Sequence, residues 1–174
     1  MPTRRRFLAL TGATALVPLA ARAVPDDPLA MATTYGHDLV ELPLEPVRLS
    51  EAEWRARLTP EAFRVLREEG TERAYTSPLN DETRAGTYAC AGCALPLYRS
   101  EVKYDSGTGW PSFTEAIRGA VATKPDRFLL VLRTEVHCAR CEGHLGHIFE
   151  DGPPPTGNRH CLNGVALEFR PDVA

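Results

Sequence analysis

The 174-residue sequence lacks a long apolar run, an internal repeat, a run of like charge and an excess of basic residues. Its N-terminal apolar stretch, Leu8 to Ala20, is shorter than the roughly 20 residues of a membrane-spanning helix. It also contains Gly12 and Pro18, which argues against a membrane anchor. Lys and Arg number 20 against 23 Asp and Glu, a balance that argues against a nucleic-acid partner.

Residues 1–23 have the pattern of an export signal. The basic segment Thr3-Arg4-Arg5-Arg6-Phe7-Leu8 precedes the apolar stretch, and Ala21-Arg22-Ala23 is a small-residue cleavage site. Paired arginines followed by Phe-Leu are typical of the bacterial twin-arginine signal. We therefore expect export to the periplasm by that route, with removal of the signal. The remaining chain has 16 basic and 23 acidic residues, a net charge of −7.

The rest of the chain is about the size of one domain. Residues 24–47 contain four prolines and no clear period, which predicts an extended tether or a strap over the domain surface. Residues 48–174 are expected to form the domain itself. Here Ser50-Glu51-Ala52-Glu53 is a capping box that opens a short helix carrying Trp54 and Leu58. Thr59-Pro60 begins a second helix, which Gly70 ends.

In that second helix, Phe63, Val65 and Leu66 are expected to face inward. After Pro78 the pattern changes to short β-like runs separated by Gly, Pro, Asp and Asn clusters. These runs are Gly86–Ala89, Phe128–Leu132, Glu135–His137, His147–Phe149 and Val165–Phe169. The sequence therefore predicts short helices in front of a mainly β domain of antiparallel sheets.

Five cysteines are present, four of them in two Cys-x-x-Cys pairs. Cys90/Cys93 and Cys138/Cys141 each follow a β-like run, as in zinc knuckles, and together supply a tetrahedral thiolate set for one structural zinc. Two disulfides, or a thioredoxin-like redox motif, are the alternatives. Export of an already folded, zinc-loaded protein favours the zinc site. Four cysteines leave no open position for a catalytic metal.

The fifth cysteine, Cys161, lies in the polar and cationic run Asn158-Arg159-His160-Cys161-Leu162-Asn163. A neighbouring cation favours the thiolate, which is the nucleophilic form. Upstream, His144 and His147 could be metal ligands, a structural pair or acid–base groups. Trp110 follows a Gly-rich loop and precedes a proline, an arrangement that favours a rigid, exposed ring over a plain core residue.

The motifs occur in a fixed order: Cys-x-x-Cys, Ser-Gly-x-Gly-Trp-Pro-Ser-Phe, Cys-x-x-Cys-x-x-His-Leu-Gly-His-Ile-Phe-x-Asp-Gly-Pro, and Pro-Thr-Gly-x-Arg-His-Cys-Leu-Asn. From about Leu49 to Pro171 the chain resembles the peptide-methionine (R)-S-oxide reductases, the B-type methionine sulfoxide reductases. The resemblance implies two antiparallel sheets in a barrel-like β fold, a structural Zn²⁺ on the paired cysteines, and a thiol-dependent reductase. Its substrate would be methionine (R)-S-oxide in oxidised proteins or as the free amino acid.

Carried over by position, the resemblance makes Cys161 the nucleophile. Trp110 would pack against the methyl group on the sulfoxide sulfur. His144, His147 and Asn163 would orient and polarise the sulfoxide oxygen, and Arg159 would favour the thiolate. Attack would leave Cys161 as a sulfenic acid.

Two positions depart from the family pattern. Thr108 stands where many members carry a resolving cysteine, and His160 stands where Tyr or Phe is usual. A thioredoxin-like or other external thiol is therefore the expected reductant, acting on a monomer. Two other classes stay open: a non-catalytic zinc-ribbon binding module, and a thiol peroxidase or disulfide oxidoreductase.

Overall fold

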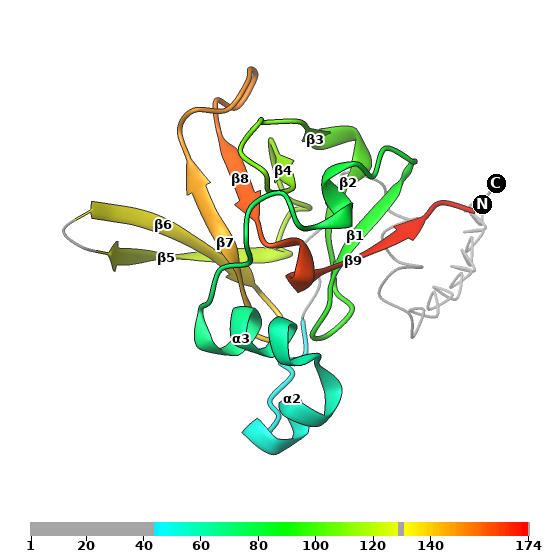
Figure 1. Ribbon diagram of the computed structural model, residues 1–174, viewed down its shortest axis with the longest axis vertical. Helices are drawn as coiled ribbons and strands as arrows, with labels where there is room; N and C mark the ends of the chain where they lie inside the picture. Colours follow the sequence, from blue (N-terminus) through cyan, green and yellow to red (C-terminus); the bar gives the residue numbers. More distant parts are fainter. Residues whose placement is uncertain (1–43, 129–130, 174) are drawn as a thin grey trace, which may run out of the picture.

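The computed structural model describes residues 44–128 and 131–173 (Figure 1). The predicted signal, residues 1–23, lies outside the described residues, as does the predicted tether up to residue 43. At residues 44–47, the Val47 N–H donates to the Arg140 carbonyl at 2.9 Å, and Leu44 and Val47 pack against the core. Within the described ranges, no helix combines the length and apolar character needed to cross a membrane.

Both predicted helices are present. The capping box opens α2 (Glu51–Arg57), where Ser50 Oγ accepts from the Glu53 N–H and the Ser50 N–H donates to Glu53 Oε2. Helix α3 (Pro60–Glu68) begins after Thr59, whose hydroxyl accepts from the Ala62 N–H. The predicted inward residues of α3 are buried, as are Trp54 and Leu58.

The end of α3 differs in detail from the prediction. The left-handed residue that closes the helix is Glu69, with φ 54°, rather than Gly70. The Gly70 N–H donates to the Arg64 carbonyl, and a Cβ at Gly70 would lie 2.9 Å from that oxygen. Glycine is therefore required there for the close approach of two backbone segments, not for its own φ.

Two antiparallel sheets form the body of the molecule (Figure 1), which confirms the predicted mainly β fold class. The three-stranded sheet has the order β2 (Pro96–Arg99), β1 (Gly86–Cys90), β9 (Leu167–Pro171). The six-stranded sheet has the order β3 (Lys103–Tyr104), β4 (Ser112–Phe113), β8 (Arg159–Leu162), β7 (His144–Phe149), β6 (Val131–Cys138), β5 (Val121–Phe128). Three 3₁₀ turns complete the order: η1 (Pro78–Asn80), η2 (Ser100–Val102) and η3 (Gly164–Ala166).

All five predicted β-like runs overlap observed strands, but their bounds differ, and two of them extend into another element. The run Phe128–Leu132 is not one strand, because Phe128 ends β5 and Val131 begins β6. This hairpin extends away from the rest of the molecule in Figure 1, and Leu132 is 68% exposed. The last strand begins at Leu167 rather than at Val165, because residues 164–166 form η3.

The core lies between the sheets and under α3, and it is built from large side chains that are fully buried. They include Tyr88, Leu97, Tyr98, Phe113, Val136, Leu145 and Leu162. Burial of such a side chain contributes about 1.5–3 kcal/mol relative to its exposure. The core thus fixes β7 and β8 at the centre of the larger sheet, where His147 lies directly opposite Cys161.

Candidate active site and metal centre

The four paired cysteines come together as one buried cluster, with their sulfurs all within 4.8 Å of one another. Cys90 Sγ lies 3.7 Å from Cys141 Sγ, and Cys93 Sγ lies 3.5 Å from Cys138 Sγ. A tetrahedron with Zn–S bonds of about 2.3 Å has sulfur–sulfur edges of about 3.75 Å, so the set fits one structural zinc. Both disulfide bonding and redox use of these pairs are disfavoured, because all four sulfurs face one centre at non-bonded distances.

The two knuckles are copies of the same turn. The residue after each pair, Ala94 and Glu142, is left-handed, with φ 63° and 59°. Each donates its N–H back to the carbonyl of the first cysteine of its pair, at 2.8 and 2.9 Å. One knuckle joins β1 to β2 in the smaller sheet, and the other joins β6 to β7 in the larger one. The metal centre therefore connects the two sheets.

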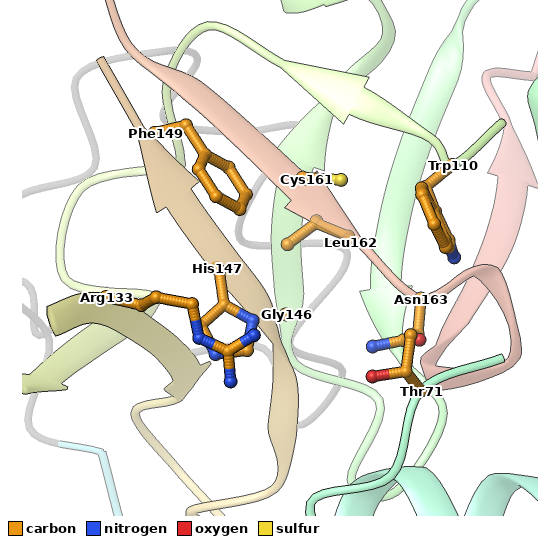
Figure 2. A pocket seen from close by; sticks show the side chains of 9 residues that line it. All are labelled: Thr71, Trp110, Arg133, Gly146, His147, Phe149, Cys161, Leu162 and Asn163. Atoms are coloured by element: carbon orange, nitrogen blue, oxygen red, sulfur yellow. The ribbon is translucent and has the colours of Figure 1, made fainter. Parts of the chain in front are cut away.

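A separate small pocket lies at the centre of the larger sheet (Figure 2). It encloses about 150 Å³ and is lined by Thr71, Trp110, Arg133, Gly146, His147, Phe149, Cys161, Leu162 and Asn163. This is smaller than the roughly 300–1,000 Å³ of a cofactor or drug-sized site, and it suits the end of one side chain. In Figure 2 the Cys161 sulfur points to the side occupied by Trp110, while His147 and Arg133 lie on the other side.

Opposing effects act on the Cys161 thiol. Burial raises its pKa above the ordinary value. The Arg159 charge and hydrogen bonds with Thr108 and Arg159 lower the pKa, and the Asp151 carboxylate raises it. Arg159 lowers the pKa of the Cys161 thiol, but burial raises that pKa by more. Arg159 does not line the pocket: it forms a bidentate ion pair with Asp151, at 2.8 Å for both contacts.

This pair predicts opposite effects for two charge-removing variants. Arg159→Gln should move the pH midpoint of Cys161 alkylation upward by about one pH unit, because a cation near the thiolate is lost. Asp151→Asn should move the midpoint downward, because an anion is lost and Arg159 keeps its charge. The rate of iodoacetamide labelling, read from the mass of the Cys161 peptide across a pH series, measures both. Shifts in the same direction would contradict this electrostatic account.

The structure separates the two predicted histidines. His147 lines the pocket, and its Nε2 lies 2.8 Å from Asp126 Oδ2. Burial lowers the pKa of His147, while the Asp126 carboxylate acts in the opposite direction. His144 is 3% exposed and does not line the pocket. Its Nδ1 lies 3.0 Å from the buried Glu135 carboxylate, and the two imidazole rings are 5.4 Å apart, edge to face.

Trp110 and Asn163 are both held at the pocket wall. The Trp110 Nε1–H donates to the Glu72 carbonyl at 3.2 Å. Asn163 Nδ2 donates to the Leu145 carbonyl, and Asn163 Oδ1 accepts from the Glu72 N–H. The side-chain amide nitrogen of Asn163 carries two hydrogens, so one of them remains as a donor for a bound group.

Comparison with known proteins matches residues 58–171 to the SelR domain family. Proteins named peptide methionine sulfoxide reductase MsrB are similar over most of the chain. That of Thiobacillus denitrificans is 53% identical over 70% of this chain and 93% of its own length. The Agrobacterium fabrum protein is 51% identical over 72% and 93%, and the Leifsonia xyli protein is 54% identical over 71% and 90%. The chain belongs to the MsrB family.

Membership of the MsrB family makes this protein an oxidoreductase that uses a thiol reductant. The cysteine cluster accordingly agrees with a structural zinc in an MsrB protein. The unusual Thr108 lies beside Cys161, with its hydroxyl 2.8 Å from Ser106 Oγ, which in turn lies 2.8 Å from Ser112 Oγ. Ser112 is the β4 partner of Cys161. A chain of three hydroxyl groups therefore runs from Thr108 through Ser106 to Ser112.

The second departure from the MsrB pattern, His160, lies away from the pocket. It is 8% exposed, and its Nδ1 is 3.0 Å from the Tyr98 hydroxyl in the core. Burial lowers the pKa of His160 to about 4, so the ring is neutral at physiological pH. Its contacts are those of a core residue.

Sequence reasoning missed four acidic residues that hold site side chains: Glu72, Asp126, Glu135 and Asp151. Each lies far from its partner in sequence or in an ordinary polar run. A signal was available for Asp151, which stands in the motif His-Ile-Phe-x-Asp-Gly-Pro. For Glu135 and Asp126 the link appears only in the strand register of the structure, where Glu135 pairs with His147 and Asp126 with Arg133.

Proposed function

We propose that this enzyme reduces methionine (R)-S-oxide in oxidised proteins, with Cys161 as the nucleophile. The observation that carries the proposal is one small pocket that brings together a thiol, an indole ring and an imidazole: Cys161, Trp110 and His147. The indole offers an apolar surface for the S-methyl group. The imidazole, held by Asp126, offers a proton near the sulfoxide oxygen.

The reaction transfers one oxygen atom. The Cys161 thiolate attacks the sulfoxide sulfur while His147 protonates the departing oxygen. The attack forms a bond between the two sulfurs, and the protonated oxygen then moves from the methionine sulfur to the Cys161 sulfur. The S–O bond and the S–S bond both break in this step, so Cys161 becomes a sulfenic acid and methionine leaves as the thioether. The methionine sulfur is reduced by two electrons, and the Cys161 sulfur is oxidised by two. If the methyl is fixed on Trp110 and the oxygen on the His147 side, one face of the sulfur is open to Cys161.

The two histidines should differ when each is replaced. His147→Ala should slow the chemical step about a hundredfold, because an acid within the pocket is lost. His144→Ala should slow it less, since its ring lies behind His147. Single-turnover rates with methionine (R)-S-oxide measure the difference. Undiminished rates in both variants would return the histidines to a structural role, and a larger loss for His144→Ala would reverse their order.

The oxidised enzyme should wait for an external thiol. Thr108 cannot form a disulfide with Cys161, and the other four cysteines form the metal site. A thioredoxin-like partner would attack the sulfenic acid, release water and form a mixed disulfide, which a second thiol resolves.

A trapping experiment tests this cycle. The protein is oxidised with one equivalent of methionine (R)-S-oxide, and its intact mass is measured with and without a sulfenic-acid trap. An adduct on Cys161, with zinc retained, is expected. A product that cannot be trapped and has lost two hydrogens would show that another cysteine resolves the intermediate. The S epimer serves as the control, and it should leave the mass unchanged.

We further propose that the protein acts as a monomer in the periplasm after twin-arginine export. The arginine pair before Phe7 supports this proposal, together with the cleavage site at residues 21–23. Fractionation of cells that express the full chain, with Arg4–Arg6 intact or replaced by Lys, tests the route. Equal amounts of processed periplasmic protein from both versions would exclude it.

A further inference from the structure

Glu72 is a buried acid that the proposed chemistry does not use. It is 2% exposed, in the loop between α3 and η1. Its carboxylate accepts the N–H groups of Gly164, at 2.6 Å, and Val165, at 3.0 Å. These amides open η3, directly after Asn163. Burial raises the pKa of Glu72, and no ion pair with Lys or Arg offsets this burial among the residues that the structure describes.

The backbone of the same residue binds two pocket side chains. Its N–H donates to Asn163 Oδ1 at 2.8 Å, and its carbonyl accepts from Trp110 Nε1 at 3.2 Å. Trp110 belongs to the Gly-rich loop before β4, and Asn163 follows β8. Figure 2 shows both on the same side of the pocket, with Thr71, the neighbour of Glu72, beside Asn163. Glu72 thus binds η3 through its carboxylate and two residues of the pocket wall through its backbone.

Tyr75, in the same loop as Glu72, binds the Gly-rich segment that precedes Trp110. The Tyr75 N–H donates to the Gly109 carbonyl at 2.7 Å, and the Tyr75 hydroxyl donates to the Gly107 carbonyl at 2.6 Å. A Cβ at Gly109, where φ is 89°, would lie 2.7 Å from the Tyr75 ring. The loop that carries Trp110 is therefore hydrogen-bonded to both Glu72 and Tyr75.

We infer that Glu72 is a positioning residue: its buried carboxylate anchors the α3–η1 loop to η3, so that its backbone holds Trp110 and Asn163 in one fixed geometry. A simple structural role would need only the carboxylate bonds to η3. The additional backbone bonds to two wall residues make the orientation of the indole depend on this anchor. A displacement of about 1 Å at a binding group can lower a reaction rate about a hundredfold. The catalytic part of this inference rests on the proposed function.

The test is made in a Trp54→Phe background. The sequence contains two tryptophans, so Trp110 is then the only one that remains. Acrylamide quenching of Trp110 emission is measured for the background protein, which keeps Glu72, and for its Glu72→Gln and Glu72→Ala variants. The values of kcat and KM for methionine (R)-S-oxide are measured for the same three proteins. The Gln variant keeps one acceptor oxygen and is the version chosen to retain the fold, which zinc content and circular dichroism check. Glu61→Gln is the matched control, since Glu61 is an exposed acid that acts on Glu72 only through its charge.

Both Glu72 variants should raise the quenching constant at least twofold and lower kcat/KM about 10- to 100-fold, mainly through KM. The control should change neither. A folded, zinc-containing Glu72→Gln protein in which only one of the two readouts moves, or neither, overturns the inference. The emission measurement needs no turnover. If the wild-type protein failed to reduce the R epimer, the proposed function would fall, and the emission readout alone would then decide whether Glu72 holds Trp110.

Discussion

Cys161→Ser is expected to lose turnover of methionine (R)-S-oxide by a factor on the order of 10⁴ or more, because the serine hydroxyl is a far weaker nucleophile than a thiolate. Folding should be unaffected, since the Cys161 side chain lies at the pocket wall and is only half-buried. Separated R and S epimers should be assayed with wild type and variant in parallel, with zinc content and circular dichroism as checks of the fold.

The same assay separates this enzyme from the other classes that the sequence left open. A thiol peroxidase or disulfide oxidoreductase would turn over peroxide or disulfide substrates faster than the sulfoxide. A non-catalytic zinc-ribbon module would behave alike with and without the thiol. Retention of R-epimer turnover by a folded Cys161→Ser protein would remove Cys161 from the reaction.

Cys93→Ser should lose the metal and then the fold. Structural zinc sites contribute about 10–16 kcal/mol of apparent binding free energy in zinc-finger peptides, whereas a whole domain is stable by only about 5–15 kcal/mol. If the loss of one of the four buried thiolate ligands abolishes zinc binding, the free energy lost is comparable to the whole free energy of unfolding of a domain. Metal analysis, circular dichroism and the soluble fraction measure the outcome.

Cys161→Ser is the matched control for this change, because it is the same substitution at the one cysteine outside the cluster. It should retain one zinc per chain. Well-folded, active wild-type protein that contains no zinc would contradict the assignment of the paired cysteines.

The features predicted best from sequence were those encoded within a few residues. The capping box at Ser50 and the Thr59-Pro60 start are local hydrogen-bond patterns, and each knuckle is closed within one short turn. Strand positions were harder. β5 (Val121–Phe128) contains Lys124, Pro125 and Asp126, so it has no apolar run, whereas the most apolar run of the region, Phe128–Leu132, does not coincide with a single strand.

The support of the site was not predictable for a different reason. Glu72 reaches Gly164 across 92 residues, and Asn163 is fixed by the same loop. An isolated acid in a polar run shows no sign of burial, because burial is decided by the packing of other elements. The family motifs contain Trp110, His147, Cys161 and Asn163, which line the pocket, but only the structure shows what holds them in place.

The repeated turn at the two knuckles has a consequence for how this molecule assembles. Each knuckle is closed by its own backbone bonds, so each hairpin can form its half of the ligand set before the two meet. The ligands come from positions 45 to 51 residues apart, and they converge only when the smaller sheet docks on the larger one. Metal binding thus stabilises the contact between the two sheets. Retention of zinc is accordingly a measure of whether the two sheets of this protein are in contact, independent of the state of Cys161.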